Sequence, residues 1–109
     1  MELFDDDDRY ALQERYLALT RNELPAAALR HGWVIREDHC FMRVILDHLF
    51  EACWYDHLDR RLRAYKQLND GQLREAVRLG EAMLAGGSGL VESMNRASLG
   101  WRGKSERVQ

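Results

Sequence analysis

The segment from Phe41 to Tyr55 most constrains the fold, because its apolar side chains point in almost every direction around a helix. These side chains are Phe41, Met42, Val44, Ile45, Leu46, Leu49, Phe50, Ala52, Trp54 and Tyr55. A helix without a wide polar face must be covered on several sides. Asp38 is a suitable residue to begin such a helix. We therefore predict one helix from Asp38 to about Leu58, at the centre of the molecule.

Four further helices are predicted from apolar side chains at three- and four-residue spacing and from residues that begin or end helices. They cover about Asp6 to Asn22, Pro25 to Gly32, Asn69 to Gly86, and Ser88 to Gly100. Residues 59–67 are predicted as a loop, and 102–109 as a polar tail that frays. No segment alternates in polarity as a strand would. The expected fold class is all-α, a compact bundle of about five helices around the central one.

Length and composition limit the kind of protein. A chain of 109 residues forms one domain, 1–109, and its 16 basic and 18 acidic residues argue against a polybasic nucleic-acid binder. No apolar stretch is long enough to cross a membrane, and the acidic start differs from a secretory signal. Lys66 and Lys104 are the only lysines, and such a preference for arginine is typical of GC-rich bacterial genomes. We expect a bacterial, cytoplasmic protein.

Polar residues at four-residue steps interrupt the central apolar segment. They are His39, Arg43, Asp47 and Glu51, which a continuous helix places on one face. One interpretation is a ligand or catalytic site, together with Tyr55, in which Arg43 holds an anion and Asp47 or Glu51 acts as a base. The other is a structural strip of ion pairs, or a solvated seam between neighbouring helices.

Metal and thiol chemistry have weaker support. Cys53 and His57 are one turn apart if the central helix continues, which is a spacing used by zinc ligands. Two ligands are half of a zinc site, and His31 is the only histidine outside this helix. Cys40 directly follows His39, so their side chains diverge on a helix. We expect no metal site and no cofactor.

One basic segment contains an aromatic residue, Tyr65. Its basic members are Arg60, Arg61, Arg63 and Lys66. Such a segment is typical of contact with phosphate or nucleic acid. The alternative is a solvated loop whose charge is balanced by neighbouring acids, Asp56, Asp59 and Asp70.

Three segments carry a resemblance to known proteins. DHCFMRVILD at 38–47, CWYDHL at 53–58 and NRASLGWR at 95–102 resemble small bacterial proteins, some of them described as relatives of GNAT-type acetyltransferases. The resemblance implies a compact family with Asp-His-Cys-Phe at the start of its central helix. The acetyltransferase fold itself requires a mixed sheet and a Gly-rich loop for coenzyme A. The sequence predicts no strands, and Arg78 to Gly89 differs from that loop, so we do not expect the acetyltransferase fold.

These observations favour an accessory or regulatory module that acts by binding a protein partner or a second copy of itself. The apolar central helix and the aromatic residues Trp33, Trp54 and Trp101 support this hypothesis, since large aromatics often anchor interfaces. The first alternative is a small-ligand protein or enzyme with its site along His39 to Tyr55. The second is a nucleic-acid binder that uses Arg60 to Lys66. No membrane partner is expected.

Overall fold

The computed structural model describes residues 6–103, and this part of the chain is helical without a strand, as the sequence predicts. The α-helices are α1 (Asp6–Ala18), α2 (Leu24–His31), α3 (Asp38–Phe50), α4 (Ala64–Gln67), α5 (Asp70–Gly86) and α6 (Ser88–Trp101). A π-helical segment, η1 (Leu19–Glu23), joins α1 to α2, and a 3₁₀ turn, η2 (Trp54–Asp56), follows α3. The prediction of an all-α bundle is confirmed.

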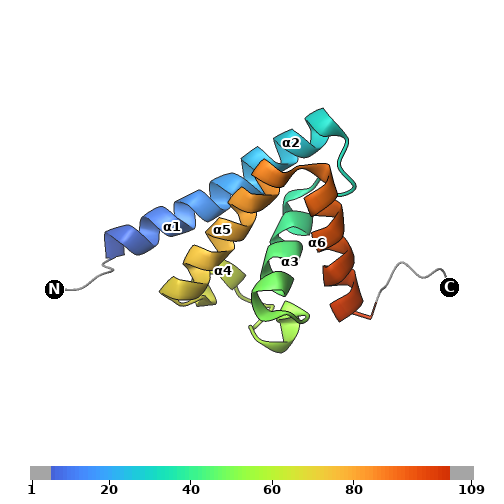
Figure 1. Cartoon of the computed structure of the whole chain (residues 1–109). Helices are drawn as coiled ribbons and strands as arrows, with labels where there is room; N and C mark the ends of the chain where they lie inside the picture. Colours follow the sequence, from blue (N-terminus) through green and yellow to red (C-terminus); the bar gives the residue numbers. More distant parts are fainter. Residues whose placement is uncertain (1–5, 104–109) are drawn as a thin grey trace.

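Helix α3 occupies the middle of the bundle. Figure 1 shows α1, η1 and α2 as one long rod, with α5 beside α1 and with α6 next to α3. Helix α3 contacts η1, α2, α5, α6 and η2. Its side chains Phe41, Val44 and Ile45 have no exposed surface, which places the core around this helix. The predicted central position of the Asp38 helix is therefore correct.

The predicted break between the first two helices is wrong. The helix expected to end at Asn22 continues through η1 into α2, with Pro25 in the first turn of α2. A proline inside an α-helix clashes with the carbonyl four residues earlier. In η1 the Leu24 N–H bonds to the Leu19 carbonyl, five residues back, and this wider turn leaves room for the proline.

The central helix is shorter than predicted, because it ends at Phe50 rather than near Leu58. Glu51 takes the left-handed conformation, with φ of 52°. The Asp47 carboxylate then accepts a hydrogen bond from the Trp54 N–H at 2.9 Å. That bond draws the chain back across the end of α3. A side chain within the helix thus fixes the turn, where neither glycine nor proline marks an end.

The C-terminal half follows the prediction closely. Asn69 and Gln72 form the expected reciprocal capping box at the start of α5. The chain turns at Gly87, and α6 begins at Ser88 as expected. Residues 59–67 are loop apart from the single turn of α4. Most of the predicted tail, residues 104–109, lies outside the described residues. Within residues 6–103, no helix combines the length and apolar character needed to cross a bilayer.

Candidate functional site

The carboxylate of Asp47 is the centre of a polar network between α3 and α6. It has no exposed surface. Oδ2 accepts from Arg102 Nε at 2.6 Å and from Ser98 Oγ at 2.7 Å. Oδ1 accepts from the Trp54 N–H and from Arg102 Nη2, the latter at 3.2 Å. Two carboxylate oxygens offer about four acceptor positions. All are in use, so we assign Asp47 a structural role and not that of a base.

Arg43, one turn earlier on α3, joins the same network through neutral groups. Its Nη1 donates to Ser98 Oγ and its Nη2 to Asn95 Oδ1, both at 2.8 Å. Ser98 therefore accepts from Arg43 and donates to Asp47. The guanidinium is held in place without a carboxylate partner of its own among residues 6–103. These two hydrogen bonds fix the orientation of the guanidinium. Its positive charge is not neutralised by a carboxylate of the described residues.

A pocket of about 350 Å³ opens beside this network, between α3, the end of α1 and the residues that follow α3. Within the described residues its basic lining is His39 and the arginines Arg21, Arg43, Arg63 and Arg102. No aspartate or glutamate of that part of the chain lines it. Arg102 is paired with Asp47, whereas Arg21 and Arg63 form no ion pair with any described residue. The pocket therefore carries excess positive charge.

Aromatic side chains form much of the remaining wall. Tyr16 lies 6.0 Å from Tyr65, and Trp54 lies 4.9 Å from Tyr55, measured between ring centroids. The guanidinium of Arg102 is 4.8 Å from the centre of the Tyr55 ring. A pocket with flat apolar walls and fixed cations favours a flat organic anion.

The Tyr16 side chain is 1% exposed, and its hydroxyl makes no hydrogen bond with the described residues. No fully enclosed side-chain oxygen or nitrogen in this part of the chain lacks a partner. The hydroxyl must therefore reach the pocket surface, which Tyr16 lines. Burial raises the pKa of this phenol far above its ordinary value, while the nearby charge of Arg21 opposes the shift.

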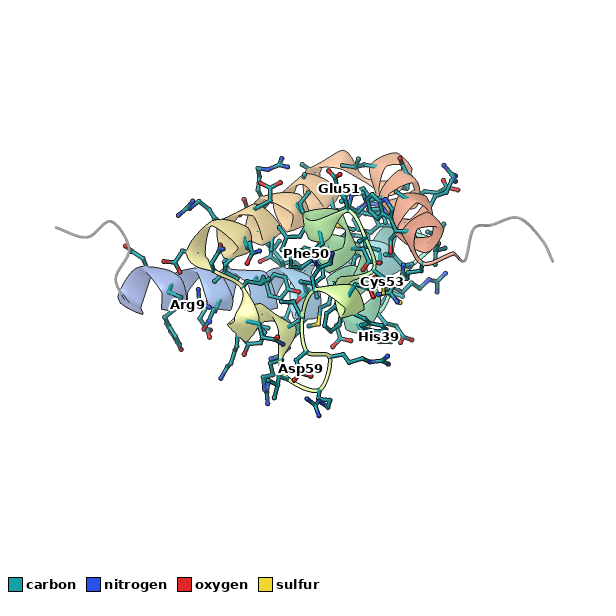
Figure 2. The ribbon with its side chains drawn as sticks, turned by 90° about the horizontal axis from the view of Figure 1, so that it is seen from below. Arg9, His39, Phe50, Glu51, Cys53 and Asp59 are labelled. Carbon is teal, nitrogen blue, oxygen red and sulfur yellow. The ribbon has the colours of Figure 1, made fainter. Side chains whose placement is uncertain are left out.

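The structure separates the residues that the sequence placed along one helical face. His39, Arg43 and Tyr55 line the pocket. Asp47 is buried behind it and pairs with Arg102 rather than with Arg43. Glu51 ends the helix, is exposed, and lies toward α5 and α6, away from His39 (Figure 2). Because α3 ends at Phe50, only His39, Arg43 and Asp47 of the four residues at four-residue spacing lie within the helix.

The basic segment meets the same pocket, a relationship that the sequence did not predict. Arg63 lines the pocket, and Arg60 lies 3.9 Å from the centre of the Tyr55 ring. Arg61 is bound to Asp59 through two hydrogen bonds, and Lys66 is exposed. Within this basic segment, the charge of Arg61 is therefore balanced by Asp59, as in the solvated-loop interpretation, while Arg63 lines the pocket.

The spacing of Cys53 and His57 does not place them on one helical face, because the helix has already ended. The ring of His57 stacks on Phe50 at 4.7 Å. Cys40 and Cys53 are free and half-buried. Across residues 6–103, histidine, cysteine and acidic side chains form no group of three able to hold a metal ion.

Sequence reasoning missed several residues of the site. Ser98 and Asn95 lie on α6, and Ser98 interrupts a buried stripe that includes Val91 and Met94. A polar side chain within such a stripe is a usable signal, because buried hydroxyls need partners. Arg102 was assigned to the tail, yet its side chain is only 12% exposed and binds Asp47. Tyr16 and Arg21 were not predicted as site residues. Arg21 lies within the π-helical segment η1 and Tyr16 lies shortly before it in α1, and the sequence did not reveal this segment.

Comparison of the chain with models of protein families, with curated proteins and with solved structures found no match. The resemblance to GNAT-related bacterial proteins is untested by these comparisons.

Proposed function

We propose that this protein binds a small organic anion in the pocket beside Arg43. The observation that carries the proposal is the set of arginines that line the pocket without a lining carboxylate among residues 6–103. Guanidinium groups bind carboxylates and phosphates through paired hydrogen bonds. This is the small-ligand alternative of the sequence analysis, with Asp47 and Glu51 removed from the contact surface.

The network behind the pocket supports binding by preorganisation. Ser98 and Asn95 hold the guanidinium of Arg43 before a ligand arrives. Restriction of this long side chain in the free protein reduces the entropy that binding would otherwise lose. The volume of about 350 Å³ lies near the lower end of the range for small-molecule pockets. It suits a metabolite better than a protein segment.

The binding-module hypothesis and the homodimer stay predictions. Trp33 is buried and Trp54 lines the pocket, so Trp101, at 38% exposure, is the tryptophan best placed to contact a partner. The large exposed apolar side chains are spread over different elements, including Tyr10, Leu29 and Leu62. Single exposed apolar residues are common on proteins without a docking surface. The bacterial source and cytoplasmic location likewise stay expectations.

The proposal is tested by calorimetric titration of the purified chain with benzoate, inorganic phosphate and a nucleoside monophosphate, against neutral benzamide. We expect at least one anion to bind and benzamide to bind at least tenfold more weakly. Replacement Arg43→Gln should weaken that anion by at least tenfold, since a charge-assisted hydrogen bond is worth about 1.5–3 kcal/mol.

Arg78→Gln is the matched control, because it removes the same charge from an exposed site on α5. We expect this control to bind the anion like the parent protein. Equal binding by the Arg43→Gln variant, or absence of binding by every anion, would overturn the proposed function.

A further inference from the structure

We propose that the anion is a phosphorylated flat-ring compound with the chemistry of a nucleoside monophosphate, bound with its ring on the aromatic wall and its phosphate at the arginines. This inference rests on the proposed function and names the class of ligand for the same pocket. It joins two features that the sequence analysis treated separately, the polar face of α3 and the basic segment from Arg60 to Lys66.

The charge of the pocket favours a phosphate over a single carboxylate. Arg102 is already neutralised by Asp47. Arg43 is held by neutral side chains, and Arg21 and Arg63 form no ion pair within residues 6–103. Three arginines around one small pocket exceed the charge of one carboxylate. A phosphate monoester carries nearly two negative charges at neutral pH and offers three acceptor oxygens.

The walls favour a flat ring. The Trp54 side chain is half-buried, and Met42 and Leu46 complete an apolar surface on α3 next to it. Tyr65 reaches the pocket from α4, close to the ring of Tyr16. Planar rings that combine stacking surface with nearby cations are the usual means by which proteins hold an unpaired base.

The hydroxyl of Tyr16 requires a polar partner from the ligand. It belongs to a side chain that is 1% exposed and lines the pocket, and it has no hydrogen bond from the described residues. Buried tyrosine hydroxyls nearly always have a partner. A nucleotide supplies further acceptors on its base and sugar.

The same chemistry has two sources, a free nucleotide or the phosphorylated end of a single strand. The basic segment distinguishes them by position. Arg63 lines the pocket, whereas Lys66 lies outside it and is exposed. Lys66 follows the lining residue Tyr65 on α4, so we expect a strand that leaves the pocket along α4 to contact Lys66 and a free nucleotide not to.

The test measures Kd by calorimetry for AMP, UMP, adenosine, inorganic phosphate and benzoate with the full chain. We expect the better nucleotide to bind at least tenfold tighter than adenosine, phosphate and benzoate. Arg21→Gln and Arg63→Gln should each lower the affinity for the nucleotide at least threefold. The same variants should lower the affinity for adenosine by less than twofold. Both side chains are exposed, so these variants retain the fold. Tyr16→Phe, which keeps the buried ring, should weaken the nucleotide at least threefold, with Arg78→Gln as the matched control.

The outcomes separate this inference from the proposed function. If benzoate binds as tightly as the nucleotides and Arg43→Gln still abolishes its binding, the nucleotide assignment is overturned while the anion pocket stands. If no anion binds, both fail. A 5′-phosphorylated single-stranded hexamer distinguishes the source. Tighter binding of the hexamer than of AMP, lost in Lys66→Gln, supports a strand end, and equal affinity supports a free nucleotide.

Discussion

Arg102, directly after α6, forms a two-point ion pair with the fully buried carboxylate of Asp47 in the last turn of α3. The two contacts are Nε to Oδ2 at 2.6 Å and Nη2 to Oδ1 at 3.2 Å. The hydrogen bonds to Asp47 raise the pKa of Arg102 above its ordinary value, so this guanidinium stays charged. Residues 55 positions apart in sequence thereby fix the C-terminal end of α6 against the last turn of α3.

The first prediction concerns the stability of this pair. Asp47→Leu and Arg102→Leu should each destabilise the protein by about 3–5 kcal/mol, because each leaves an unpaired charge in a largely buried place. The double replacement should cost less than either single change. Urea unfolding followed by circular dichroism measures all three variants.

The exposed pair Arg78 and Glu75 provides the control for that cycle. Arg78→Leu should change the free energy of unfolding by less than about 1 kcal/mol. A double variant at Asp47 and Arg102 that loses the full sum of the two single effects would contradict the structural role given to the pair.

Ser98→Ala tests the connection between stability and binding. The hydroxyl accepts from Arg43 and donates to Asp47, so its removal should lower the free energy of unfolding by about 1–3 kcal/mol. The replacement also removes one of the two hydrogen bonds that orient the Arg43 guanidinium. Anion affinity should fall severalfold in calorimetry, although Ser98 does not line the pocket. Ser93→Ala, at an exposed position of the same helix, should change neither quantity. Unchanged affinity in the Ser98 variant would show that Arg43 does not need this support.

The burial of Tyr16 should make the free energy of unfolding depend on pH in the alkaline range. Burial raises the pKa of its phenol in the folded state, whereas the unfolded chain ionises near pH ~10. The stabilisation is complete below that pH and is lost as the pH rises toward the pKa of the folded state. The free energy of unfolding should therefore fall as the pH rises above about 10, and fall less in Tyr16→Phe. Absorbance titration of the parent protein against Tyr16→Phe should place the ionisation of Tyr16 above the ordinary pKa of a phenol.

The sequence predicted the helical class and the position of α3 because apolar periodicity reports burial directly. It did not predict where α3 ends, since Asp47 fixes that end through a hydrogen bond to Trp54 that no local pattern encodes. It placed a break before Pro25, because the π-helical segment that accommodates this proline has no sequence signature. Of the residues predicted from spacing along the central helix, His39, Arg43 and Tyr55 line the pocket. Arg102 was not predicted as a site residue because a charged residue near the end of a chain is usually exposed to solvent. Its buried partner, Asp47, is distant in sequence.

The end of α3 gives a last prediction. Glu51 adopts φ of 52°, which for a residue other than glycine or asparagine costs roughly 1–2 kcal/mol. Glycine removes this strain and loses about 0.5–1 kcal/mol in backbone entropy, so Glu51→Gly should leave stability unchanged or raise it by up to about 1 kcal/mol. Glu51→Val should lower it, because a branched side chain is most strained there. Glu92→Gly, at an exposed position inside α6, should cost about 1 kcal/mol and serves as the control for glycine itself. If Glu51→Gly lowers the free energy of unfolding as much as Glu92→Gly does, α3 continues past Phe50. Trp54 and Tyr55 would then not occupy the positions that line the pocket.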